Sequence, residues 1–257
     1  MTRVITVIGG KGGVGKTTLT SNLASALSEL GQDVIAIDAN LTTPNLGIHL
    51  GLHFAPNTIH QVLKGESKLK DSIYPHEAGF KLIPASMSVE DLEGVDVGRL
   101  PEITFNLLGK SDFVILDSAA GLGREAISAI NAADEVLIIT NPDLPSAADA
   151  LKTVKLAEKM NKKILGVVLN KVKRKDFELT KKEVEEMIGY TVLVEVPEDK
   201  SLLKALFAKT PVVNFDPHSP AAREFRKLAH NLVGIPFAEE RPFGFKLIDR
   251  LVKWINT

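Results

Sequence analysis

The 257-residue chain lacks cysteine altogether, so it has no disulfide, no thiolate metal site and no cysteine-ligated iron–sulfur cluster. Long apolar runs are also missing, because no stretch reaches the roughly 18 apolar residues that a membrane span needs. Charge of one sign is not in excess either: the formal net charge is −1, and no global field favours nucleic acid. The N-terminal apolar run is too short for a signal peptide. These absences predict a soluble cytoplasmic protein, or one that sits on a membrane surface.

What the chain does contain is a regular alternation of short β-branched runs with helix-length segments. Most of the runs are almost continuously apolar, as strands buried on both faces of a parallel sheet are. The alternation predicts an α/β fold, a doubly wound and mostly parallel sheet with right-handed crossovers. Strands are expected at 3–8, 33–38, 80–85, 112–117, 135–140, 163–170 and 191–196, and helices at 16–30, 122–132, 146–161, 176–188, 199–208 and 219–233.

Near the C-terminus the composition changes. The segment 234–244 is rich in proline, glycine and charge, and it precedes a short amphipathic stretch. We therefore expect one large domain over 1–235, a linker over 236–242 and a separate amphipathic helix over 243–257.

A glycine-rich motif follows the first expected strand. Residues 10–17 satisfy G-x-x-x-x-G-K-[ST] and stand between a strand and a helix, where a phosphate-binding loop must lie. Its backbone N–H groups and the helix N-terminus favour phosphate, Lys16 is expected to reach the β and γ phosphates, and Thr17 to bind Mg²⁺. A structural glycine turn is the alternative. The motif predicts a site for ATP and Mg²⁺ formed by Gly10, Lys11, Gly12, Gly13, Val14, Gly15, Lys16, Thr17 and Thr18.

The motif carries a second lysine, Lys11. The run "KGGVGKT" resembles the deviant Walker A motif of the MinD/ParA family of P-loop ATPases. The resemblance extends from residue 1 to about 235 and implies an ATP-bound homodimer in which Lys11 reaches the phosphates of the partner subunit. A cation supplied in trans neutralises charge that develops in the transition state. A solvated loop lysine is the alternative for Lys11.

Two further segments resemble the family's nucleotide-sensing loops. "VIAIDANLTTPNLGIHLG" (34–51) is similar to switch I, and "FVILDSAAGLG" (113–123) to Walker B and switch II, with alanine where the family usually has proline. The resemblance implies that Asp38 and Asp117 organise Mg²⁺ and water together with Thr17, Asp117 acting through water.

The base side of the site is implied by "LNKV" (169–172) and "VPED" (196–199). The resemblance implies that Asn170 hydrogen-bonds the adenine, and that Pro197 and Asp199 flank it. Asn170 could instead cap the end of a strand, and Asp199 could be a helix N-cap, which would not exclude the first role.

Position 40 departs from the family pattern, which usually has a second aspartate here. Asn40 is isosteric with aspartate, so the loop and the bound nucleotide should be retained, but an amide cannot accept a proton. Loss of a general base typically costs about 10²–10⁴ in rate. Asn40 therefore predicts slow or blocked hydrolysis. The expected catalytic residues are Lys11, Lys16, Asp38 and Asn40. Asn40 could be a deliberate substitution for aspartate, or the chain could be a natural family member that hydrolyses ATP slowly or not at all.

The tail at 243–256 favours the MinD-type branch. On a helical projection its apolar residues form one continuous arc, and the remaining face carries three cations and one anion. This resembles a C-terminal membrane-targeting helix and implies reversible binding to an anionic membrane at the inner face of the cell membrane. A helix packed on the body, or one that binds a partner, is the alternative. The arc consists of Phe243, Phe245, Leu247, Ile248, Leu251, Val252, Trp254 and Ile255.

Two rival functions remain open. A ParA-type partition ATPase would bind DNA through lysines in 152–183, but acidic residues follow closely, so nucleic acid is not the partner we expect. A switch that positions a flagellar or chemotaxis assembly would act through protein contacts. The sequence names neither an activating protein nor a cargo. The histidines show no ligand spacing, so Mg²⁺ is the only metal expected.

Overall fold

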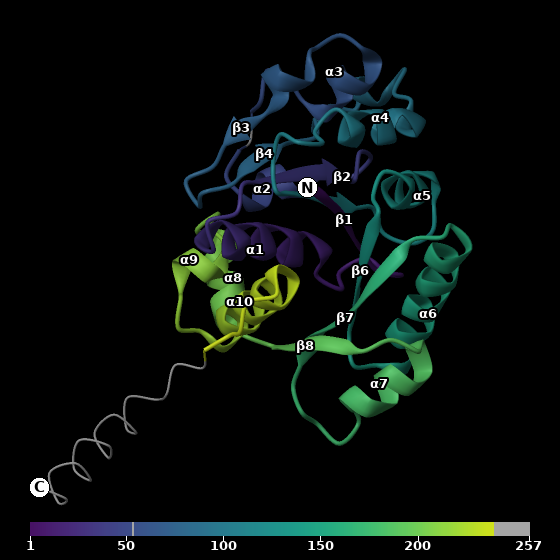
Figure 1. Ribbon diagram of the computed structural model, residues 1–257, viewed down its shortest axis with the longest axis vertical. Coiled ribbons are helices and arrows are strands. Elements are labelled where there is room, and N and C mark those ends of the chain that lie inside the picture. Colours follow the sequence, from purple (N-terminus) through teal and green to yellow (C-terminus); the bar gives the residue numbers. More distant parts are fainter. Residues whose placement is uncertain (53, 239–257) are drawn as a thin grey trace, which may run out of the picture.

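The computed structural model describes residues 1–52 and 54–238, and within them a single eight-stranded sheet forms the centre of the fold (Figure 1). The strand order is β3-β4-β2-β5-β1-β6-β7-β8. Every pairing is parallel except that of β3 with β4. The strands are β1 Arg3–Ile8, β2 Val34–Ala39, β3 Tyr74–Pro75, β4 Lys81–Ile83, β5 Phe113–Ser118, β6 Glu135–Thr140, β7 Lys163–Val172 and β8 Val192–Pro197.

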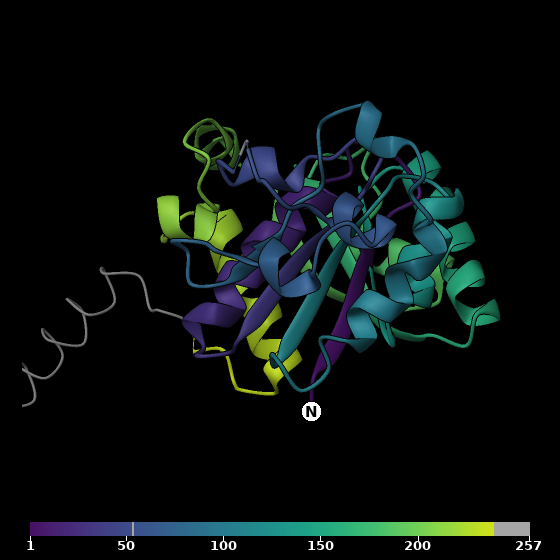
Figure 2. The ribbon, with the colours of Figure 1, turned by 90° about the horizontal axis from the view of Figure 1, so that it is seen from above.

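Helices cover both faces of this sheet, as a doubly wound fold requires (Figure 2). One apolar cluster joins one face of the sheet to α1, α2 and α8–α10, and two further clusters join the other face to α3–α7. None of the described helices is both long and apolar enough to cross a bilayer. The helices are α1 Lys16–Glu29, α2 Leu46–His49, α3 Ile59–Lys64, α4 Leu100–Phe105, α5 Arg124–Asn131, α6 Leu144–Lys159, α7 Lys181–Ile188, α8 Lys200–Phe207, α9 Val212–Phe215 and α10 Pro220–Val233.

The seven strands and six helices expected from the sequence are all present, with one boundary wrong by several residues. The helix predicted to begin at residue 176 begins at Lys181, because Thr180 is its N-cap. The Thr180 side chain accepts from the backbone of Glu183 while the Glu183 side chain accepts from the backbone of Thr180, a capping box that fixes the first turn. The expected linker and C-terminal helix lie almost entirely outside the described residues.

Burial explains why the central strands read as apolar runs. All six residues of β2, β5 and β6 are buried, as are five of the six in β1. Strand β1 lies between β5 and β6, so the chain leaves β1 toward one side of the sheet and later returns to the other. Such a reversal opens a crevice at the carboxyl ends of the strands, which is where this fold class binds ligands.

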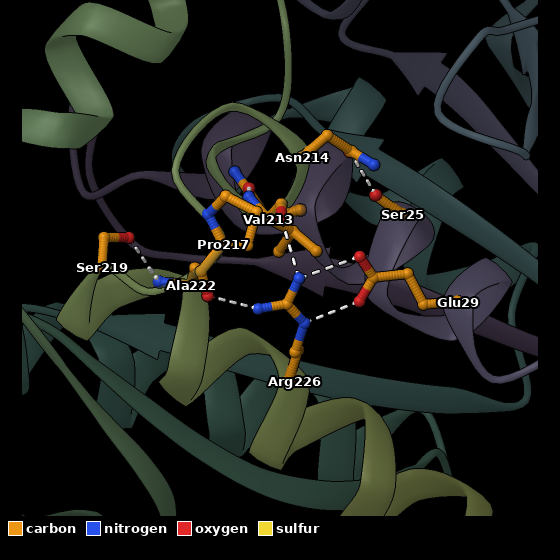
Figure 3. Close-up of polar contacts among 9 residues, drawn as sticks. Ser25, Glu29, Val213, Asn214, Pro217, Ser219, Ala222 and Arg226 are labelled. Atoms are coloured by element: carbon orange, nitrogen blue, oxygen red, sulfur yellow. Dashed lines mark hydrogen bonds and ion pairs between the residues drawn. The ribbon is translucent and has the colours of Figure 1, made fainter. Parts of the chain in front are cut away.

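Helix α1, which follows the glycine-rich loop, is anchored at its far end by Arg226 of α10 (Figure 3). The guanidinium donates to both carboxylate oxygens of Glu29, at 2.6 and 2.9 Å, and to the carbonyls of Val213 and Pro217. A second contact, from Ser25 Oγ to Asn214 Oδ1 at 2.6 Å, ties α1 to α9. The planar guanidinium of Arg226 thus joins α1, α10 and the segment 213–217, and fixes the position of α1 relative to the other two.

Candidate nucleotide-binding site

The glycine-rich loop connects β1 to α1, and its conformation depends on glycine at particular positions. Gly13 and Gly15 have φ of +76° and +105°, which side chains other than glycine's rarely allow. A Cβ on Gly15 would lie 2.2 Å from Asn170 Nδ2, and one on Gly10 would lie 2.5 Å from Asp149 Cβ. Gly15 is also the N-cap of α1 and offers no side-chain acceptor, so the first N–H groups of the helix are left for a ligand.

The two lysines of the loop lie in different surroundings. Lys16 is buried, and its Nζ donates to the carbonyl of Lys11 at 3.3 Å. Burial lowers the pKa of the Lys16 ammonium, an effect that the nearby Asp117 opposes. The Lys11 side chain is 40 % exposed, and its Nζ lies 3.6 Å from Asp149 Oδ2 on α6. In the isolated chain the second lysine therefore makes an ion pair within its own subunit.

Two buried carboxylates face each other at the ends of neighbouring strands. Asp38 of β2 and Asp117 of β5 are partners in the parallel register, and both are almost fully buried. Burial, reinforced by the charge of Asp117, raises the pKa of Asp38 well above its usual value. Burial also raises the pKa of Asp117, to about 6, against the opposing effects of Thr17 and Lys16. The two expected carboxylates are thus brought together at the crevice.

The oxygen atoms around Asp117 fit a magnesium ion. Thr17 Oγ1 donates to Asp117 Oδ2 at 2.6 Å, which places the hydroxyl at the start of α1 beside the end of β5. The other oxygen, Asp117 Oδ1, is buried and has no hydrogen-bond partner. Hydroxyl and carboxylate oxygens are the ligands that Mg²⁺ prefers, and a divalent cation would relieve both the unpaired oxygen and the facing carboxylates.

A cavity of about 820 Å³ lies against the loop, large enough for a nucleotide. Its walls include the phosphate-loop residues Lys16 and Thr17 on one side and Asn40 on another. Most of its apolar lining comes from α8 and the segment 210–212. Pro197 lines a neighbouring depression that shares Glu198 with this cavity, and the expected contact between Pro197 and the base stays a prediction.

Asn170 and Asp199 line the cavity, and their side chains already have partners in the protein. Asn170 Nδ2 donates to the carbonyl of Val14 at 2.6 Å, which ties the end of β7 to the phosphate loop. The Asp199 carboxylate accepts from the backbone N–H of Ser201 at 2.8 Å and from that of Ala221 at 3.2 Å. Asp199 is the N-cap of α8, which was the alternative reading of this residue.

Asn40 stands at the start of the loop that follows β2. Its Oδ1 accepts from Thr43 Oγ1 at 3.0 Å, and its Nδ2 donates to the Thr43 carbonyl. Asp38 holds both ends of the same loop: it accepts from the backbone N–H of Asn40 at 3.2 Å and from those of Asn45 and Leu46 at 3.0 Å each. The Asn40 side chain therefore borders the cavity on a loop that hydrogen bonds hold at both ends.

Sequence reasoning missed two residues that support these loops. Lys171 Nζ donates to the carbonyl of Gly13 at 2.7 Å, and Lys171 itself has a positive φ of 59°. Glu125 in the first turn of α5 accepts from the backbone N–H groups of Leu41 and Thr42. The position of Lys171 next to Asn170 was a usable signal, whereas nothing in the sequence links Glu125 to a loop 84 residues away.

A glycine-rich loop between a buried strand and a helix, a buried loop lysine, and a carboxylate beside the Thr17 hydroxyl together define a P-loop NTPase. The matching family model is described as ParA, "NUBPL iron-transfer P-loop NTPase", and it spans residues 1–233. The chain belongs to this ParA family, whose MinD/ParA-type ATPases it resembles in sequence and structure. Because the chain has no cysteine, it offers no thiolate for iron.

The similar proteins are matched along most of their length. An uncharacterized ATP-binding protein of Methanocaldococcus jannaschii is 38% identical over 233 residues, which cover 91% of this chain and 89% of that protein. The septum site-determining protein MinD of Thermotoga maritima is 31% identical over 243 residues, with coverage of 91% and 89%. The structure of MinD with Mg-ADP from Pyrococcus horikoshii superposes with a TM-score of 0.88 at 35% identity, covering 90% of this chain and 96% of that one.

Proposed function

We propose that this chain is a MinD-like ATPase that acts as an ATP-dependent switch for dimerisation and membrane association, with hydrolysis slowed or blocked at Asn40. The observation that carries the proposal is the phosphate loop with its second lysine, set beside the buried pair Asp38 and Asp117. The process served is spatial positioning, of the cell division site or of a similar structure. Its cargo and its activating protein are unspecified.

Different residues of the site contact different parts of ATP in this proposal. The N–H groups of the loop and of α1 bind the phosphates, and Lys16, already buried against the loop, neutralises their charge. Thr17 and Asp117 would hold Mg²⁺, and the ion would supply positive charge that offsets the negative charge of the phosphates. Asn170 holds the loop through Val14, so that the cavity beside it keeps its shape.

Lys11 connects ATP binding to dimerisation in this proposal. In one subunit it pairs with Asp149 across 3.6 Å, with 40 % of its side chain exposed, so the contact is weak and open to exchange. The triphosphate of a second subunit carries more negative charge than one carboxylate and competes for the ammonium. The ATP state is then a homodimer, and loss of the γ phosphate returns Lys11 to Asp149.

Asn40 accounts for the slow or blocked state. Its amide occupies the expected place at the edge of the cavity, but it has no charge and accepts no proton. Its oxygen accepts from the Thr43 hydroxyl and its nitrogen donates to the Thr43 carbonyl. The chain therefore binds ATP and Mg²⁺ and releases phosphate slowly.

Membrane association rests on the stretch 243–256, which lies outside the described residues. A single amphipathic helix binds an interface weakly, but two on one dimer act together, and avidity can rise by roughly 10²–10⁴. The protein would then be cytoplasmic with ADP and at the inner face of the membrane with ATP. The rival, DNA binding by the lysine-rich span 152–183, predicts retention on DNA rather than on lipid.

Sedimentation with anionic vesicles tests the proposal. We expect the chain to sediment with the vesicles in ATP and Mg²⁺ and to stay in the supernatant in ADP. Leu251→Glu, which places a charge within the apolar arc, should abolish sedimentation while ATP binding is retained. Asn256→Glu, which adds the same single negative charge outside the apolar arc, is the control and should still sediment. Sedimentation that ignores the nucleotide, or that survives Leu251→Glu, would contradict the membrane switch.

A further inference from the structure

Glu125 joins the two loops that follow the buried carboxylates. It lies in the first turn of α5, directly after the segment 119–123 that leaves Asp117. Its Oε2 accepts from the N–H of Leu41 at 3.0 Å and from that of Thr42 at 3.4 Å, and its Oε1 accepts from the Thr42 hydroxyl. A side chain at the start of α5, where the loop after β5 ends, therefore holds the loop after β2.

These contacts fix the residues immediately after Asn40. On one side of Asn40 its own backbone N–H is bound to Asp38, and on the other side Leu41 and Thr42 are bound to Glu125. Leu41 is 3 % exposed and packs in the apolar cluster under the loop, so the anchored stretch has little freedom to shift. Hydrogen bonds from N–H groups to a carboxylate are charge-assisted and are stronger than those to a neutral acceptor.

We propose that Glu125 is a positioning residue that makes the loop after Asp38 and the loop after Asp117 respond together to the γ phosphate. Glu125 is not among the residues that line the cavity, so it acts through Asn40 and its neighbours rather than on the nucleotide. This inference rests on the proposed function, because it assigns to Glu125 the distinction between ATP and ADP. The hydrogen bonds of Glu125 within the described residues go to Leu41 and Thr42 and not to the phosphate loop, which would bind either nucleotide.

The test compares the affinities of the full chain for ATP and for ADP, each with Mg²⁺, by calorimetry. We expect Glu125→Ala to leave the affinity for ADP unchanged and to reduce the preference for ATP by about tenfold, within the usual range of coupling between sites. Glu125→Gln keeps one oxygen acceptor, so its preference for ATP should lie between that of the wild type and that of Glu125→Ala. Hydrogen exchange at the Leu41 and Thr42 amides should accelerate in the nucleotide-free Glu125→Ala variant.

Glu178→Ala is the matched control. Glu178 also accepts from two loop N–H groups, those of Lys173 at 2.9 Å and Lys175 at 3.3 Å, but in a loop remote from Asn40. It should leave the preference for ATP intact. Equal losses of affinity for ATP and ADP in Glu125→Ala, or an unchanged preference, would overturn the inference and leave the proposed function standing. A wild-type chain with no preference for ATP would overturn both.

Discussion

Replacing one carboxylate of the buried pair should stabilise the nucleotide-free protein at neutral pH. Asp117→Asn keeps an oxygen that accepts from Thr17 Oγ1, but it removes the charge that faces Asp38. A carboxyl whose folded pKa is about 6, against 3.8 ordinarily, binds its proton more tightly in the folded chain. Its stabilising contribution is complete below about pH 4 and is lost as the pH rises through 6.

The magnitude follows from the same two values. A rise in pKa from 3.8 to about 6 corresponds to about 3 kcal/mol of unfolding free energy. The wild-type chain loses this stabilisation when Asp117 ionises in the folded state. The pKa of Asp38 is also raised, so ionisation of Asp38 also lowers the free energy of unfolding as the pH rises. Asp117→Asn should therefore exceed the wild type in stability at about pH 7.5 and lose this advantage at about pH 4.

Urea unfolding with a metal chelator measures both points. The exposed Asp176→Asn is the control, because it removes one negative charge in a surface loop. With Mg²⁺ and ATP added the order should reverse, since a ligand that binds only the folded state stabilises it and Asp117→Asn has lost a metal oxygen. Identical pH profiles for Asp117→Asn and the wild type would refute the reasoning that Asp117 ionises in the folded protein at a cost in stability.

Three further predictions concern hydrolysis, the second lysine and pH. Asn40→Asp should raise phosphate release at saturating ATP with vesicles present by about 10²–10⁴; equal rates would exclude position 40 as the hydrolytic residue. Lys11→Ala should stay monomeric in ATP by light scattering, whereas Lys152→Ala, which removes the other, more exposed cation paired with Asp149, should dimerise normally. Burial lowers the pKa of His60 from 6.5, so the free energy of unfolding should fall as the pH drops below 6.5. His60→Gln should flatten this decline when urea midpoints are measured across pH. An unchanged decline would show that His60 takes no part in it.

The elements that the sequence predicts well are those that depend on neighbours along the chain. The phosphate loop is contiguous and lies between a strand and a helix, so its motif alone places it. Asp38 and Asp117 end apolar runs, and parallel register brings such ends to one edge of the sheet. Strand β3 has only two residues, too few for any periodicity, and was not foreseen.

Contacts between distant side chains are beyond the sequence. The pairing of Lys11 with Asp149 depends on how α6 packs beside the loop, and no local pattern encodes it. Lys171, which donates to Gly13, lies near the end of β7 with a left-handed backbone conformation that is uncommon for lysine and that no local pattern predicts. Pro197 lies at the end of β8, and which depression it lines depends on how β8 packs beside residues 172–175; its contact with the base stays a prediction.

The central claim is that ATP, and not ADP, brings two copies of this chain together. Light scattering of the full chain with Mg²⁺ and each nucleotide in turn tests it most directly. The account predicts twice the 27.8 kDa of one chain in ATP and the mass of a single chain in ADP. A single-chain mass in both nucleotides, or a dimer that forms equally in both, would contradict it.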